Sequence, residues 1–351
     1  MMMTKRVMRA AAMLGLLGAV ACGGGGDGAA GDGKAAAGGD SAKANRPISI
    51  AVIAKSSNNP VFLAARTGAE AAAREISARP GGPQVTVTWL TPPQEDGQVQ
   101  AQRIQQAVND GADAILIAAS DAGKVAGAID DAVNRGVAVM TFDSDVPQSR
   151  RFAYYGVDDL AVGRAVMQEL AAQMGGRGSV AILAGNQNAT NLQRRVQGVR
   201  EEAAKHPGIR IVNVFNHIET PQDAAAEVIR VNNAYPEVNG WAMVGGWPLF
   251  TRTLTDLDSA RYKIVSVDAL PAELTYVDKG IAPVLLAQPV YQWGYVGVQT
   301  IVDKLHGGKE PPQIIPMQTV RVTKENLGQW ARQLRDWGFT DVDPQYLSRQ
   351  P

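Results

Sequence analysis

From residue 48 onward, short apolar runs alternate with longer amphipathic stretches, and this alternation limits what the chain can fold into. The apolar runs have the length and composition of strands that are buried on both faces of a sheet. The longer stretches have the length and periodicity of helices that cover such a sheet. Because strands that alternate with helices build parallel sheets, the order of the elements predicts an α/β fold.

The alternation divides into two successive sets of similar order and length. For the first set we predict strands at residues 48–54, 85–90, 114–118 and 138–142 and helices at 61–78, 99–110 and 125–135. For the second set we predict strands at 180–184, 209–214, 241–244 and 264–267 and helices at 160–174, 192–205, 224–234 and 274–279. Two such sets predict two doubly wound, Rossmann-like lobes with a cleft between them. The pattern does not decide which lobe contains the last elements, at 284–286, 294–305 and 319–322.

The first 22 residues have the pattern of a signal peptide. A positively charged start at residues 5–9 precedes an apolar run at 10–20 that is too short to span a bilayer. Cys22 follows and is the only cysteine, so no intramolecular disulfide is possible. In this position Cys22 resembles the lipid-modified cysteine of bacterial lipoproteins, although an inert cysteine in a leader is the alternative. Residues 23–46 are rich in glycine and alanine and predict a flexible tether.

Charge and motifs argue against several functional classes. Lys+Arg 34 balances Asp+Glu 34, and a formal net charge of zero does not suit a nucleic-acid-binding protein. The phosphate-loop rule G-x-x-x-x-G-K-[ST] is not met, and neither a G-x-S-x-G elbow nor an H-E-x-x-H motif occurs. The three histidines lack metal-ligand spacing. We therefore expect no enzyme activity, no cofactor and no metal.

Polar side chains follow the predicted strands in both sets, at the edge where open α/β sheets bind ligands. These residues are Asn59, Asp143, Ser144, Asp145, Asp268 and Gln288. Taken singly, each aspartate is an ordinary helix-capping or turn residue, but several together favour a shared ligand. Planar carboxylate, amide and guanidinium groups form paired hydrogen bonds with neutral polyols. Aromatic rings such as those of Phe62 and Trp247 cover the apolar face of a sugar.

Five short motifs carry a resemblance to a known family. They are NNPVF at 58–62, TFDSD at 141–145, NLQRRVQG at 191–198, VD at 267–268 and AQP at 287–289. In this order they resemble the ribose-type periplasmic sugar-binding proteins of ABC importers, over about residues 47–322. The resemblance implies a type I periplasmic-binding-protein fold whose two lobes are joined by a multi-strand hinge. It assigns residues 47–156 with 289–318 to the N-terminal lobe and 157–288 with 319–351 to the C-terminal lobe and tail.

The resemblance also implies a set of ligand-binding residues. The residues carried over from the family are Asn59, Phe62, Asp143, Arg195, Asp268 and Gln288. To these we add, from their positions beside the same motifs, the candidates Lys55, Ser144, Asp145, Asn191 and Trp247. Asn191 lies one helical turn before Arg195, so both side chains can face the cleft. Ser144 occupies the place where ribose binders carry arginine, and Val61 the place of one stacking aromatic residue, which argues against ribose itself. Lys55 stands where the ribose pattern has a small hydroxyl residue, and a charged donor there favours a ligand richer in acceptors than ribose. Trp247 either stacks on the ligand or belongs to the core.

The expected function is that of a solute-binding protein in the periplasm or at the cell surface. We expect a monomer, anchored to the membrane through a lipid on Cys22, that delivers a monosaccharide or related polyol to an ABC permease. A sensor that presents its ligand to a membrane receptor is one alternative. A carbohydrate enzyme that uses Asp143, Asp145 and Asp268 as acid and base is another. The tail from residue 324 is expected to pack on a lobe as an amphipathic helix.

Overall fold

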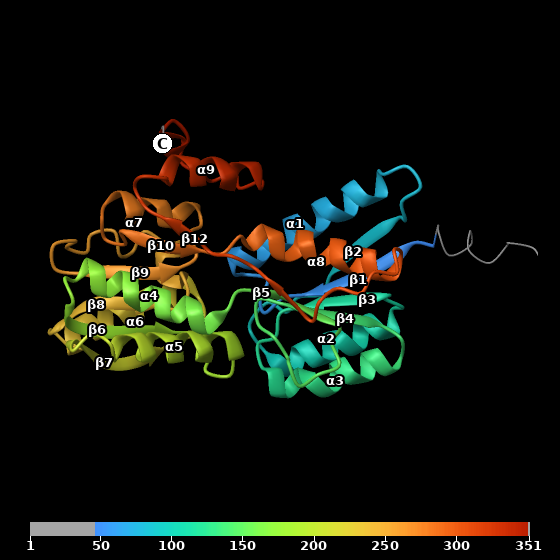
Figure 1. Cartoon of the computed structure of the whole chain (residues 1–351), viewed down its shortest axis with the longest axis horizontal. Helices are drawn as coiled ribbons and strands as arrows, with labels where there is room; N and C mark the ends of the chain where they lie inside the picture. The colour runs from blue at the N-terminus through green and yellow to red at the C-terminus, as the bar shows by residue number, and fades with distance from the viewer. Residues whose placement is uncertain (1–45, 350–351) are drawn as a thin grey trace, which may run out of the picture. The chain divides into compact units, whose positions relative to one another are not determined.

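The structure, a computed structural model, describes residues 46–349 and contains two six-stranded sheets with helices on both faces (Figure 1). The predictions for the signal peptide, for Cys22 and for nearly all of the tether lie outside the described residues. In the first sheet the strand order is β11-β5-β4-β3-β1-β2, and in the second it is β12-β10-β9-β8-β6-β7. The two sheets define the first and second lobe, and the α/β class with two doubly wound lobes is confirmed.

The first lobe has an entirely parallel sheet. Its strands are β1 (Ile48–Ile53), β2 (Val85–Trp89), β3 (Ala114–Ile117), β4 (Ala138–Phe142), β5 (Ala153–Gly156) and β11 (Ile314–Pro316). Its helices are α1 (Pro60–Ser77), α2 (Gly97–Asn109), α3 (Ala122–Asn134) and α8 (Val290–Leu305). Successive residues of β1 point to opposite faces, so Ile50 packs beneath α1 and α8 whereas Ile53 packs against α2 and α3. This explains why β1 is apolar at nearly every position.

The second lobe has the same layered construction, with one antiparallel edge where β12 pairs with β10. Its strands are β6 (Arg177–Ala184), β7 (Gly208–Asn216), β8 (Val238–Met243), β9 (Lys263–Val267), β10 (Val284–Ala287) and β12 (Val320–Val322). Its helices are α4 (Asp159–Gln173), α5 (Thr190–Ala203), α6 (Pro221–Ala234), η1 (Trp247–Phe250), η2 (Pro271–Glu273), α7 (Leu274–Asp278), α9 (Leu327–Asp336) and α10 (Pro344–Leu347). The α4 and α5 helices cover one face, and α6, α7 and α9 cover the other.

The chain passes between the sheets after β5, after β10 and after β11. Sheet pairing therefore places α8 and β11 in the first lobe and β10 and β12 in the second, which the periodicity alone left open. The strands β5 and β11 were missed as elements of their own. The three-residue β11 is half exposed and contains Pro316, so it lacks the apolar run that marks a strand. The exact residues of the lobe boundaries stay predictions.

The tail packs on the second lobe through α9, as expected. Trp330 and Leu334 are buried on its inner face, and the Trp330 indole nitrogen donates to the carbonyl of Ala269 at 2.7 Å. At the end of α9 the ring of Trp337 stacks on Tyr291 of α8 with centroids 5.8 Å apart, so the tail also contacts the first lobe. Within residues 46–349, no helix has both the length and the apolar character needed to cross a membrane.

The close packing of α1 against α8 gives a stability prediction. A β-carbon at Gly294 would lie 1.8 Å from the carbonyl oxygen of Ala65, so Gly294→Ala should lower the free energy of unfolding by about 1–3 kcal/mol through overpacking. Gly127 on the exposed side of α3 has no atom near its β-carbon position, and Gly127→Ala should instead stabilise by about 0.5–1 kcal/mol. Urea unfolding of both variants measures the difference, and equal effects would contradict the described helix contact.

Candidate functional site

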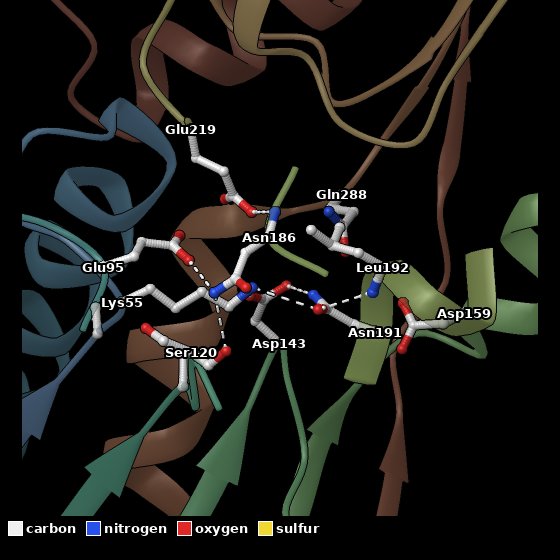
Figure 2. Close-up of polar contacts among 12 residues, drawn as sticks. Lys55, Glu95, Ser120, Asp143, Asp159, Asn186, Asn191, Leu192, Glu219 and Gln288 are labelled. Carbon is white, nitrogen blue, oxygen red and sulfur yellow. Dashed lines mark hydrogen bonds and ion pairs between the residues drawn. The ribbon is translucent and has the colours of Figure 1, made fainter. Parts of the chain in front are cut away.

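Most of the predicted polar residues line one cavity between the carboxyl ends of the two sheets. Figure 2 shows polar contacts among several of them. The cavity is lined by Lys55, Asn59, Val61, Phe62, Asp143, Asn191, Leu192, Arg195, Glu219, Gly245, Trp247, Asp268, Gln288 and Trp293. Its volume is about 20 Å³, enough for a single water. Ligand pockets usually measure roughly 300 Å³ or more, so the cavity in the described arrangement is too small for a ligand of ordinary size. Larger hollows lie outside this centre, such as one of about 290 Å³ between α1 and the tail.

Two aspartates project into the site from equivalent strands. Asp143 follows β4 and Asp268 follows β9, and each of these strands is third in the order of its sheet. Both have left-handed backbone, with φ of 55° at Asp143 and 76° at Asp268, and they are the non-glycine residues with positive φ among residues 46–349. Such a backbone costs on the order of 1 kcal/mol at each position and is found where a site requires it. The Tyr154 hydroxyl holds the first turn by donating to the Asp143 carbonyl at 2.9 Å.

A first set of contacts joins the lobes through Asp143. The Asn191 amide, at the start of α5, donates to the Asp143 carboxylate at 3.1 Å. The Lys55 ammonium lies 3.3 Å from the Asn191 side-chain oxygen and 3.5 Å from the Asp143 carboxylate. All three side chains are at least nine-tenths buried. The first lobe therefore contacts the second through a lysine, a carboxylate and an amide that bond to one another.

A second set of contacts is organised by Arg195. Its Nε donates to Asp159 at 2.8 Å, Nη1 donates to the Val244 carbonyl at 3.0 Å, and Nη2 donates to Gln288 at 3.0 Å. The Gln288 amide donates in turn to Asp268 at 3.0 Å. Nη2 also lies 3.9 Å from the Asp143 carboxylate. The Arg195 guanidinium thus bonds to Asp159, near the first passage of the chain between the lobes, and to Gln288, near the second passage.

Burial and neighbouring charges set the protonation of this network. Burial raises the pKa of Asp159 to about 6, against the attraction of Arg195. Burial also raises the pKa of Asp268, opposed by Arg195 and by the Gln288 hydrogen bond. Burial alone would lower the pKa of Lys55, but the facing carboxylates, Asp143 first, raise it overall. Lys55 is therefore positively charged in its buried position.

The two predicted aromatic residues have different surroundings. Phe62 is 2% exposed and stacks on Trp293 of α8 with ring centroids 6.0 Å apart, so it is both a cavity wall and a core residue. Trp247 lines the opposite wall, where its ring meets His217 edge-on at 4.9 Å. Asn59 lines the cavity as well, but its side-chain oxygen caps α1 by accepting from the Val61 amide at 3.1 Å. The rings of Phe62 and Trp247 thus mainly pack against other aromatic side chains.

Ser144 and Asp145, which the sequence places in the site, do not line the cavity in the described structure. The Asp145 carboxylate accepts two bonds from Arg151, at 2.5 and 2.6 Å, and one from the Thr141 hydroxyl at 2.6 Å. It therefore stabilises the turn after β4. Ser144 is 1% exposed and its backbone carbonyl accepts from the Ala119 amide. The left-handed turn at Asp143 directs the following residues away from the cleft.

Sequence reasoning missed four residues of this region. Asp159 begins α4 and has the pattern of an ordinary acidic residue in the first turn of a helix, yet it pairs with Arg195. Trp293 reads as a core position of α8 but lines the cavity. Glu95 and Glu219 lie in loops without periodicity, and they meet near the cavity only through the fold. Asp159 could have been noticed from the sequence, because it is an acidic residue just after the point where the first set of elements gives way to the second.

Comparisons with known proteins agree with this geometry. The chain matches the periplasmic binding protein domain family over residues 50–310 and belongs to that family. It is 24% identical over 272 residues to a D-ribose/D-allose-binding protein from Pseudomonas aeruginosa, covering 75% of this chain and 83% of the relative. It is 26% identical over 117 residues to a xylitol-binding protein from Mycolicibacterium smegmatis, a match that spans 33% of this chain and only 34% of that relative.

Solved structures give the same result for the fold. The ABC transporter solute-binding protein from Burkholderia graminis C4D1M, solved in complex with D-arabinose, is similar with a TM-score of 0.74 and 26% identity. The similarity covers 80% of this chain and 96% of that chain. The chain is thus a binding protein of the periplasmic type and not an enzyme, which overturns the alternative of acid–base catalysis by carboxylates. Membership of the family implies an extracytoplasmic location.

The raised pKa of Asp159 gives a prediction about pH. Its folded-state value of about 6 exceeds the ordinary 3.8, so its contribution to stability is fully present below about pH 4 and is lost as the pH rises through 6. Asp159→Asn should therefore remove a pH-dependent difference of up to about 3 kcal/mol in the free energy of unfolding. Urea unfolding between pH 4 and 7 measures it. The exposed neighbour Asp158 is the control for the change of side chain, since Asp158→Asn keeps a good helix cap and leaves the pair of Asp159 with Arg195 in place.

Proposed function

We propose that the chain is a lipid-anchored solute-binding protein that captures a monosaccharide or related polyol between its lobes and delivers it to an ABC permease. The observation that carries this proposal is the convergence of planar polar side chains from both lobes on one buried centre. Asp143 comes from the first lobe, and Asn191, Arg195, Asp268 and Gln288 come from the second. Such groups accept and donate hydrogen bonds in pairs, as neighbouring sugar hydroxyls require.

The charges around the cavity favour a neutral ligand over an anion. Lys55 and Arg195 are positively charged, and the facing carboxylates belong to Asp143, Asp159 and Asp268. An anionic ligand would therefore meet carboxylates without an excess of positive charge to offset them. The relatives named above bind, by their descriptions, D-ribose or D-allose, xylitol and D-arabinose, all of which are neutral.

Capture follows from the way the two sets of contacts are divided between the lobes. When the lobes separate, Lys55 and Asp143 leave Asn191 and Arg195, and each polar group needs a new partner. A ligand with several hydroxyls can supply partners to both lobes at once, and it then favours the closed arrangement by its differential affinity. A permease that reads the closed arrangement would accept only loaded protein. The lipid on Cys22 and the tether of residues 23–46 would keep the protein near that permease.

Calorimetry on the full-length chain tests the proposal with D-ribose, D-arabinose, D-allose and xylitol. We expect at least one of them to bind with a dissociation constant in about the micromolar range or tighter. A micromolar constant corresponds to a binding free energy of about −8 kcal/mol. Asp268→Asn should weaken binding by roughly tenfold or more, because it removes a carboxylate from the cavity. Asp145→Asn is the matched control and should leave the affinity unchanged, since Asp145 lies outside the cavity. Absence of heat with a wider panel of pentoses, hexoses and polyols would contradict the function.

Lys55 is proposed to determine which sugar is preferred. Its ammonium lies at the centre of the interlobe contacts, where it donates to Asn191 and pairs with Asp143. Lys55→Ala should therefore change the order of affinities within the panel as well as the affinities themselves. Lys124→Ala removes an exposed lysine of α3 and should leave that order intact. A Lys55→Ala profile that is weakened uniformly would show that Lys55 has no part in selectivity.

A further inference from the structure

Two glutamates from different lobes meet beside the binding cavity. Glu95 precedes α2 in the first lobe, and Glu219 follows β7 in the second. Both residues line the same hollow at this edge of the cleft, and the two carboxyl groups come together at Asn186, close enough for Glu219 to act on Glu95. Asn186 connects them, because its backbone amide donates to Glu219 at 2.7 Å and its side-chain amide lies 3.4 Å from Glu95 (Figure 2). The same amide donates to the Ser120 carbonyl at 3.1 Å. These contacts form a latch of Glu95, Asn186 and Glu219 across the cleft.

The latch has too little positive charge nearby to neutralise two carboxylates. Lys55 faces it from the turn after β1, but the Lys55 ammonium bonds to Asn191 and pairs with Asp143. Burial lowers the pKa of His217, which stands two residues before Glu219, so that ring is neutral. The other charged groups around the hollow at this edge are Asp96, Asp121 and Lys124.

The state of Glu95 agrees with a shared proton. Its Oε1 is buried and has no hydrogen-bond donor among the residues that the structure describes. Burial raises the pKa of Glu95 well above its ordinary value, Glu219 adds to the effect, and Lys55 opposes it. Two carboxyl groups in contact cannot both be ionised at low cost, whereas one proton between them makes a hydrogen bond.

We propose that Glu95 and Glu219 hold one proton between them when the lobes meet, so that closure over a ligand takes up a proton. This inference rests on the proposed function, and it adds a regulation of the same site by pH. With the lobes apart, each glutamate faces water on its own lobe, and a carboxyl group in water is ordinarily ionised near neutral pH. On closure one proton moves from solvent to the pair, and no other bond is made or broken. Ligand therefore binds more tightly as the pH falls, by at most tenfold per pH unit for a single proton.

Proton uptake is measured by titrating xylitol and D-arabinose into the full-length chain in buffers of different ionisation enthalpy at pH 7. We expect close to one proton per bound ligand. Glu95→Gln should reduce the uptake to near zero, because a glutamine amide donates to Glu219 without a proton from solvent. Glu219→Gln should do the same from the other lobe. Asp121→Asn removes a nearby carboxylate, keeps the cap of α3 and should retain the uptake. Uptake that persists in both glutamine variants would assign the proton to another group and overturn the proposal.

A measurement without ligand separates this proposal from the proposed function. Spin labels on cysteines at the exposed positions Gln98 and Asn188, in a Cys22→Ser background, report the distance across the cleft. We expect a larger fraction of short distances at pH 5.5 than at pH 8, and no such change in Glu95→Gln. A fraction that does not depend on pH would overturn the shared proton even if sugars bind. If no sugar binds but the fraction of short distances changes with pH as expected, the proposed function is contradicted and the shared proton is supported.

Discussion

The buried guanidinium of Arg195 is the interaction on which the site depends. All three of its nitrogens bond within the protein, to a carboxylate of α4, to a strand-end carbonyl and to the amide of Gln288. Its position follows from a close crossing of α4 and α5, where β-carbons on Gly163 or Gly198 would lie 2.0–2.2 Å from backbone oxygens of the opposite helix. Since breaking a buried ion pair from one side leaves an uncompensated charge, the partners of Arg195 are held in place together.

This arrangement relates the ligand site to the passages between the lobes. Asp159 lies just after β5, where the chain first enters the second lobe, and Gln288 lies just after β10, where it returns. Arg195 bonds to both, and it also faces Asp143 of the first lobe at 3.9 Å. A ligand hydroxyl that displaces any of these bonds acts on groups next to the crossings. Under the proposed function, binding and lobe movement involve the same side chains, and no separate relay is needed.

The sequence predicts the layers and most of the cavity wall, because both depend on local patterns. Alternating apolar runs locate the strands, and the polar residues at their ends, such as Asp143, Asp268 and Gln288, come to the cleft with them. That these residues contact a ligand stays a prediction. The pattern does not show an orientation that is set by a single turn, so it groups Asp145 with the site although the Asp145 carboxylate bonds to Arg151 and does not line the cavity. It also fails for Glu95 and Glu219, whose pairing depends on loops of two different lobes.

Lys55 shows why a closed cleft can still be selective. In the described arrangement its ammonium fills the space between Asp143 and Asn191, and the remaining cavity holds about 20 Å³. A ligand that broke these contacts and offered no hydrogen bonds in their place would leave a buried charge unpaired, which costs several kcal/mol. A small solute with one or two hydroxyls cannot bond to Lys55, Asp143 and Asn191 and also reach Asp268. Under the proposed function, a ligand needs hydroxyls spread over several carbons to bond with both lobes, so the polar groups that join the lobes also set the minimum size of what can replace their contacts.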